Sequence, residues 1–213
     1  MERGMSRNKY IVIEGLDYSG KSSVISSLHS RLNNVCVVRE PGGTLYGEAI
    51  RKLILEDQTP TNRFDPETEL LAMMSQRNHL FNKVIHPALN EGKTVLSDRS
   101  IASTYVYQVN DANVKLFDAL LPNLPSIIMP SYYVYLDIDY PTYLRRFRVR
   151  HAKHQMFDNI DEATFNKRRY RYMDFMDYLG DAKTLCIDTS NTHSPVDVAN
   201  RVYDNLLNAG FVE

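Results

Sequence analysis

Short apolar runs alternate with longer amphipathic segments along most of the chain. The apolar runs lie at Lys9–Glu14, Asn34–Arg39, Lys93–Asp98, Tyr132–Asp137 and Lys183–Asp188. The amphipathic segments predict helices at Lys21–Asn33, Tyr46–Glu56, Pro66–Asn90, Tyr140–Lys153, Glu162–Tyr178 and Pro195–Asn208, and a broken helix at Ile101–Leu121. This alternation predicts an α/β fold in which a five-stranded parallel sheet has helices on both faces. No repeat or linker interrupts the pattern, so residues 1–213 are expected to form a single domain.

The ends of the predicted strands carry charge. Four of the five runs end in an acidic or basic residue, namely Glu14, Arg39, Asp98 and Asp137. In open parallel sheets, ligands bind beyond the carboxyl ends of the strands. A functional site is therefore expected at these strand ends.

The composition argues against several kinds of partner. The formal net charge is −1 at pH 7, whereas bulk nucleic-acid binding depends on an excess of Lys and Arg. No apolar stretch approaches the roughly 20 residues that span a bilayer, and the first ten residues lack the apolar core of a signal peptide. We therefore expect a cytoplasmic protein that binds neither nucleic acid nor membrane. The two cysteines, Cys36 and Cys186, lie in predicted buried strands and are expected as reduced thiols.

The stretch EGLDYSGKSS, residues 14–23, follows the first apolar run and precedes a predicted helix. Gly15 and Gly20 lie five residues apart and are followed by Lys21 and Ser22. Glycines let backbone N–H groups turn toward phosphate oxygens, Lys21 adds positive charge near the β- and γ-phosphates, and the Ser22 hydroxyl can bind Mg²⁺. The motif predicts a P-loop for a nucleoside triphosphate, contacted by Gly15, Leu16, Asp17, Tyr18, Ser19, Gly20, Lys21, Ser22 and Ser23.

A P-loop alone does not separate a GTPase, a motor and a kinase. A GTPase is disfavoured, because Asn82-Lys83 continues with Val84-Ile85 instead of the N-K-x-D pattern that reads guanine. The chain instead carries further anion-binding and polar groups near other strand ends. These are REPGGT at residues 39–44, Arg51, Arg77, and SDRSIASTYVYQ at residues 97–108.

With these motifs in this order, the chain from Lys9 to about Asn208 resembles the thymidylate kinases, specifically their bacterial type. The resemblance implies the P-loop nucleoside monophosphate kinase fold with a small helical lid at about residues 145–160. It also implies that the γ-phosphoryl group of ATP, bound with Mg²⁺, is transferred to dTMP to give dTDP and ADP in dTTP synthesis. Such transfer between two polyanions requires alignment and positive charge, which arginine supplies with planar, bidentate geometry.

The resemblance also implies roles for single residues. Asp17 reaches the 3′-hydroxyl of the acceptor deoxyribose, and Arg51 and Arg99 bind the acceptor phosphate. Arg77 donates to thymine O4, Thr104 and Gln108 hydrogen-bond the base, and Tyr107 favours a deoxyribose. The full dTMP-binding set comprises Asp17, Glu40, Arg51, Met73, Arg77, Asp98, Arg99, Thr104, Tyr107 and Gln108, and the catalytic set Lys21, Asp17, Arg99, Arg146 and Arg150. Without the resemblance, Arg77 could be an ordinary solvated arginine, and Glu40 could simply pair with Arg39.

The lid is expected in YLRRFRVRHAKHQ, residues 143–155. Helical spacing places Arg146 and Arg150 on one face, and closure over ATP would exclude water. Tyr18 occupies a loop position where another branch of the family has arginine, so the catalytic arginine should come from the lid. Because residues 155–158 read QMFD where bacterial relatives carry D-R-x-E, the choice among Arg146, Arg148 and Arg150 stays open.

Met73 stands where the family places a phenylalanine against thymine, and a thioether specifies a ring plane less well. Alternative substrates are therefore dUMP, a 5-modified dUMP, or another deoxynucleotide or deoxynucleoside. A nucleotide-binding module without turnover is a further alternative, but it would predict loss of the phosphate-binding residues.

A homodimer is expected from the excess of apolar side chains on one helix. They are Leu70, Leu71, Met74, Leu80, Phe81, Val84 and Ile85.

Overall fold

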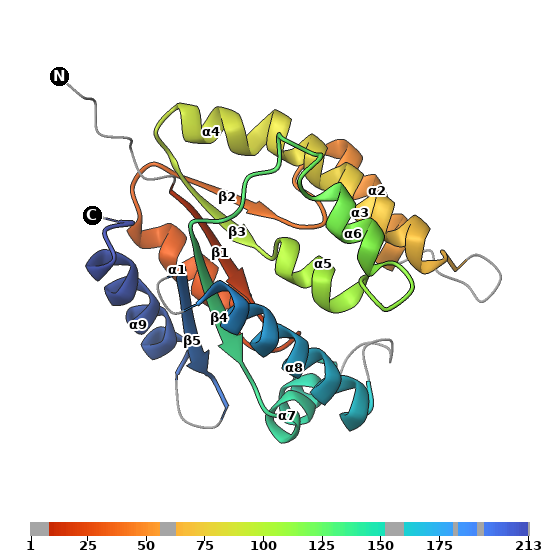
Figure 1. Ribbon diagram of the computed structural model, residues 1–213. Coiled ribbons are helices and arrows are strands. Elements are labelled where there is room, and N and C mark those ends of the chain that lie inside the picture. Colours follow the sequence, from red (N-terminus) through yellow and green to blue (C-terminus); the bar gives the residue numbers. More distant parts are fainter. Residues whose placement is uncertain (1–8, 56–62, 152–159, 181–182, 191–193, 213) are drawn as a thin grey trace. The chain divides into compact units, whose positions relative to one another are not determined.

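The computed structural model describes residues 9–55, 63–151, 160–180, 183–190 and 194–212. A five-stranded parallel sheet, in the order β2-β3-β1-β4-β5, is flanked by helices (Figure 1). The strands are β1 (Tyr10–Glu14), β2 (Val35–Arg39), β3 (Thr94–Asp98), β4 (Tyr132–Asp137) and β5 (Thr184–Asp188). The α/β class and all five predicted strands are confirmed, with each strand starting within one residue of its expected position.

The chain divides into two compact units. The first unit contains the residues up to Ile11 and Asn34–Ser131, and the second contains Val12–Asn33 and the residues from Tyr132 onward. The prediction of a single domain stays a prediction. Half of the expected lid, residues 152–159, lies outside the described residues.

In the first unit, β2 and β3 pair in parallel, with Val35 opposite Thr94 and Arg39 opposite Asp98. Helix α3 (Pro66–Leu80) starts at an Asp65 cap whose carboxylate accepts from the Thr68 N–H. It continues through a π-helical turn, Phe81–Ile85, into α4 (His86–Asn90), so the predicted helix 66–90 is one helical run, coloured yellow in Figure 1. The unit also holds α2 (Leu45–Leu55), which packs on α3, and the two parts of the predicted broken helix, α5 (Ile101–Tyr107) and α6 (Val114–Leu120).

In the second unit, β4 and β5 pair in parallel, with Tyr133 opposite Thr184 and Asp137 opposite Asp188. Helix α8 (Glu162–Leu179) packs on β4, where the Tyr172 ring stacks on Tyr135 with centroids 5.2 Å apart. The other helices are α1 (Lys21–Arg31), α7 (Tyr140–His151) and α9 (Pro195–Asn208), and α1 packs against α9.

The two cysteines occupy the edge strands, and the prediction that both are buried is wrong. Cys36 on β2 is half-buried and Cys186 on β5 is exposed, because an edge strand has a neighbouring strand on one side only. Neither residue forms a disulfide.

The apolar side chains of α3 and of the π-helical turn are mostly buried. Of the seven side chains from which a dimer face was expected, five are fully buried: Leu70, Met74, Leu80, Phe81 and Ile85. Leu71 is 47% exposed and Val84 is half-buried. Most of the apolar excess of this helix is therefore buried in the fold. No helix in the described ranges is both long and apolar enough to cross a membrane.

Candidate active site

The predicted P-loop connects β1 to α1 in the second unit. Gly15 and Gly20 have φ values of 148° and 102°, which favour glycine. A Cβ on Gly15 would lie 2.6 Å from the carbonyl oxygen of Leu136, so a side chain there would collide with backbone. The Lys21 ammonium donates to the carbonyl oxygens of Gly15 and Leu16, each at 3.0 Å. The side chain of Lys21 is thus held against the backbone of the loop.

Arg146 on α7 contacts the backbone of the loop. Its guanidinium donates to the carbonyl oxygen of Tyr18 at 2.9 Å and to that of Thr189 at 2.5 Å. Burial and the neighbouring Arg145 lower the pKa of Arg146. Arg150, one turn further along α7, is exposed. Of the two predicted catalytic lid arginines, Arg146 is therefore the one that the structure brings to the loop.

Thr189, directly after β5, is a loop contact that the sequence analysis missed. Its hydroxyl lies 2.9 Å from the carbonyl oxygens of both Ser19 and Asp137, and the residue is 3% exposed. The sequence signal was weak, because a single threonine after a short strand is common. The other face of the loop is fixed by Tyr18, which has a φ of 66° and packs edge-on against Tyr143 and Phe147 of α7.

The remaining residues of the loop differ in exposure. Asp17, Ser22 and Ser23 are exposed, and Leu16 and Ser19 are buried. Ser22 lies in the first turn of α1, where N–H groups and the helix dipole favour an anion.

The sequence analysis also did not identify a charged contact between α8 and the end of β4 in this unit. Arg169 on α8 forms two hydrogen bonds to the carboxylate of Asp137, at 2.7 and 2.5 Å. These bonds raise the pKa of the Arg169 guanidinium. Asp137 was recognised as a charged strand end, but Arg169 is one of three arginines close together on α8, and sequence does not show which one faces the strand.

In the first unit, three arginines come together near the ends of β2 and β3. Burial lowers the pKa of Arg51, and so does the positive charge of Arg39 and Arg99. Arg51 also donates to the carbonyl oxygen of Pro41 at 3.2 Å. Arg99 has a φ of 70°, donates to Ser103 Oγ at 3.1 Å and lies over the Tyr107 ring. We call Arg39, Arg51 and Arg99 the arginine cluster.

The sequence analysis named Arg39 as a charged strand end and as part of the REPGGT motif but not as a site residue, yet its charge acts on Arg51. It also forms an exposed ion pair with Glu48 at 2.7 Å. Asp98, at the end of β3, is half-buried, and its Oδ1 is buried without a hydrogen-bond partner among the described residues. The positive charges of the three arginines in the arginine cluster repel one another. This repulsion favours the binding of an anion between them.

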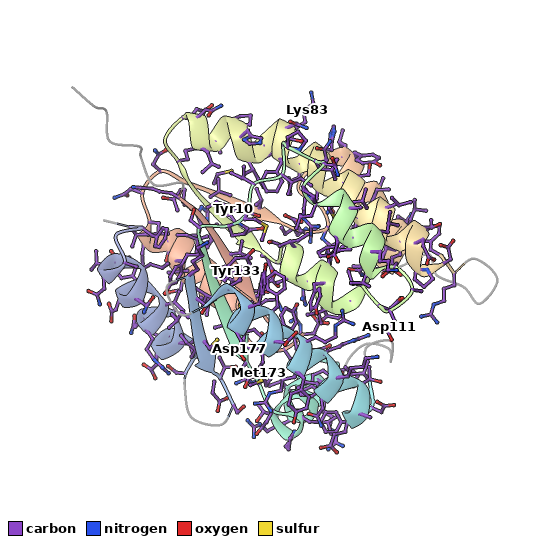
Figure 2. The ribbon with its side chains drawn as sticks, viewed as in Figure 1. Tyr10, Lys83, Asp111, Tyr133, Met173 and Asp177 are labelled. Carbon is purple, nitrogen blue, oxygen red and sulfur yellow. The ribbon has the colours of Figure 1, made fainter. Side chains whose placement is uncertain are left out.

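Arg77 on α3 and Glu40 form a buried ion pair at 2.6 Å, with each side chain 1% exposed. Arg77 also donates to Thr104 Oγ1 at 2.9 Å. Arg77 is therefore not a solvated arginine, and Glu40 pairs with Arg77. Tyr10, whose hydroxyl lies 3.5 Å from Glu40, points into the interior of this unit, whereas Lys83 points away from it (Figure 2).

The other predicted base contacts surround this pair. Met73 lies four residues before Arg77 on α3 and is buried, so both side chains share one helix face. Gln108, at the end of α5, donates from Nε2 to Glu69 Oε1 at 2.8 Å. Glu69 lies on the same face of α3 and was not predicted as a site residue. The first unit thus brings together the predicted acceptor residues Glu40, Arg51, Met73, Arg77, Asp98, Arg99, Thr104, Tyr107 and Gln108.

Comparisons with known proteins agree with these features. A family model described as thymidylate kinase matches residues 13–199. The chain is 34% identical to the thymidylate kinase of Pseudoalteromonas translucida over 203 residues, which are 90% of this chain and 94% of that protein. It is 30% identical to the thymidylate kinase of Mycoplasmoides gallisepticum over 211 residues, covering 96% and 94% of the two chains.

A solved structure is similar as well. The crystal structure of thymidylate kinase from Ehrlichia chaffeensis superposes with a TM-score of 0.69 at 26% identity, covering 93% of this chain and 97% of that one. These relatives give no support to the alternative substrates or to a module without turnover. The P-loop, the arginine cluster and the buried Arg77 are thus found in a chain that matches one family over nearly its whole length. The chain belongs to the thymidylate kinase family.

Proposed function

We propose that this chain transfers the γ-phosphoryl group of ATP to dTMP, giving dTDP and ADP. Family membership supports the activity, and the arginine cluster is the observation that carries it. Arg51 is held partly buried beside two other guanidinium groups, an arrangement that a dianionic acceptor phosphate would stabilise. A module that only binds a nucleoside would not require this charge.

The residues of the P-loop would bind ATP. Backbone N–H groups of the loop and of the first turn of α1 bind the phosphates. Lys21 stabilises the charge that develops on the moving phosphoryl group. Arg146, anchored to the loop through the Tyr18 carbonyl, adds positive charge next to the loop. The contact of Asp17 with the deoxyribose stays a prediction.

Mg²⁺ fits this loop. Proteins bind Mg²⁺ mainly through substrate phosphates and waters, with one or two protein oxygens, so a dedicated cage of carboxylates is not needed. The exposed Ser22 hydroxyl in the first turn of α1 would supply such an oxygen. When bound, the ion neutralises charge on the β- and γ-phosphates.

A coupled ADP-release assay with ATP and four acceptors, dTMP, dUMP, dGMP and thymidine, tests this proposal. We expect dTMP to be preferred over thymidine, because the arginine cluster requires a phosphate, and over dGMP, because the site around the buried Arg77 requires a pyrimidine edge. Turnover of thymidine as fast as dTMP would contradict the assignment of the arginine cluster. A complete lack of dTMP turnover would contradict the function.

Arg51→Ala and Arg99→Ala should weaken dTMP binding far more than ATP binding. Each change removes a charge-assisted contact with the acceptor phosphate, which should cost about 1.5–3 kcal/mol. Steady-state KM values for the two substrates measure the difference. Lys52→Ala is the matched control, because Lys52 is an exposed cation next to Arg51 on α2. Equal weakening of both substrates would show that the two arginines do not select the acceptor.

A homodimer and a cytoplasmic location stay predictions. The apolar face on which the dimer was expected is largely buried. Exposed apolar side chains among the described residues include Leu45, Tyr46, Leu53 and Leu55 on α2 and Leu71 on α3.

A further inference from the structure

Two side-chain contacts link α3 to the end of α5. Arg77 donates to Thr104 at 2.9 Å, and Gln108 donates to Glu69 at 2.8 Å. Glu69, Met73 and Arg77 are spaced four residues apart and therefore lie on one face of α3. Thr104 and Gln108 are also four residues apart, and the N–H of Gln108 donates to the carbonyl oxygen of Thr104 at 2.9 Å. The two contacts are thus parallel links between the same two helices, with the buried Met73 between them.

The orientation of the Gln108 carboxamide follows from the chemistry of its partner. An ionised carboxylate can only accept hydrogen bonds, so the Gln108 NH₂ group must face Glu69. The carbonyl oxygen Oε1 then points the other way. It is buried and has no hydrogen-bond partner among the described residues. A buried acceptor without a donor is unfavourable, which indicates that a ligand completes it.

The backbone of Gln108 is fixed as well. Asn113, which is 1% exposed, donates from Nδ2 to the carbonyl oxygen of Gln108 at 2.9 Å and to that of Pro66 at 3.3 Å. Pro66 is the first residue of α3, three residues before Glu69. Both the position and the rotation of the carboxamide are therefore determined by the protein.

We propose that Glu69 is a positioning residue that makes Gln108 a hydrogen-bond acceptor and thereby selects a pyrimidine with a ring N–H. This inference rests on the proposed function, because it concerns the acceptor base. Thymine and uracil offer the O4 acceptor beside the N3–H donor. The O4 acceptor matches a donor from Arg77, and the N3–H donor matches the acceptor Gln108 Oε1. Cytosine offers an amino group and an unprotonated N3, the reverse pattern. A site built from hydrogen-bonding groups rejects a mismatched edge strongly.

The test compares dUMP with dCMP, which have the same size and differ only at this edge. The ratio of their kcat/KM values is measured for the full-length protein and for Glu69→Gln. A glutamine at position 69 can donate as well as accept, so the Gln108 carboxamide can rotate and present its NH₂ group. The dUMP preference should fall by about tenfold or more, while ATP binding is unchanged.

Glu67→Gln is the matched control, because it removes the same charge two residues earlier on α3 and should leave the ratio unchanged. In a Gln108→Met background, Glu69→Gln should have no further effect on the ratio, since Glu69 acts through Gln108. Circular dichroism verifies that each variant folds. Glu69→Met also removes the acceptor at position 69, and it should lower the dUMP preference as Glu69→Gln does.

Three outcomes would overturn the proposal. The first is an unchanged dUMP preference in a folded Glu69 variant, and the second is equal use of dCMP and dUMP by the unmodified protein. The third is an additive effect of Glu69→Gln in the Gln108→Met background. Turnover of dTMP by the unmodified protein is measured first. Its absence is a failure of the proposed function, whereas dTMP turnover with any of the three outcomes is a failure of this inference alone.

Discussion

Lys21→Ala should reduce dTMP phosphorylation by about a thousandfold, because it removes the positive charge that stabilises the moving phosphoryl group. The ammonium lies inside the loop at 3.0 Å from two carbonyl oxygens, within reach of phosphates bound by the same loop. Single-turnover rates at saturating ATP and dTMP separate this effect from weaker binding.

Two further variants make this prediction specific. Lys21→Met keeps most of the aliphatic stem and should lose activity to the same extent. Lys115→Ala removes an exposed lysine on α6 and should retain full activity. Far-UV circular dichroism should be unchanged for all three proteins. Activity within tenfold of the unmodified protein in folded Lys21→Ala would exclude Lys21 as the residue that stabilises the transferred group.

Arg77→Met should destabilise the first unit by about 3–5 kcal/mol, because it leaves the buried carboxylate of Glu40 without its cation. Both side chains of this ion pair are 1% exposed. The hydrogen bond from the Tyr10 hydroxyl to Glu40 Oε1 is 3.5 Å long, which is too long to replace the guanidinium. Urea denaturation measures the change in the free energy of unfolding.

The double variant Glu40→Gln with Arg77→Met separates stability from function. It removes both charges, so most of the stability should return, but dTMP binding should stay weak because the donor to the base is still missing. Arg39→Met is the stability control: its ion pair with Glu48 has a similar length, 2.7 Å, but is exposed, and its loss should cost about 0–1 kcal/mol. A stability loss for Arg77→Met as small as that of the control would contradict the proposed burial of charge.

The strands and the P-loop could be predicted from sequence because their signals are local. Each strand is a short apolar run that ends in a polar residue, and the P-loop needs its glycines, lysine and serine at fixed spacing. The helix over residues 66–90 was also predictable, since its apolar periodicity continues through the π-helical turn.

What could not be predicted are partners that are distant in sequence. Glu40 and Arg77 are separated by 37 residues, and Thr189 contacts Ser19 across 170 residues. Local pattern gives each of these residues several plausible partners, and only the folded chain chooses among them. The same limit explains the dimer argument: apolar side chains on α3 appeared to be in excess because the residues that cover them are not adjacent in sequence.

The edge position of β2 has a consequence for aggregation. Four of its five residues are apolar, Val35, Cys36, Val37 and Val38, and Val37 is 40% exposed. An apolar edge strand can pair with the same strand of another molecule and so begin intermolecular sheet growth. Two features oppose this growth: the strand is only five residues long, and it ends in the charged Arg39. Concentrated protein should therefore be most vulnerable at this edge, where a lysine in place of Val37 would add a charge without disturbing the core.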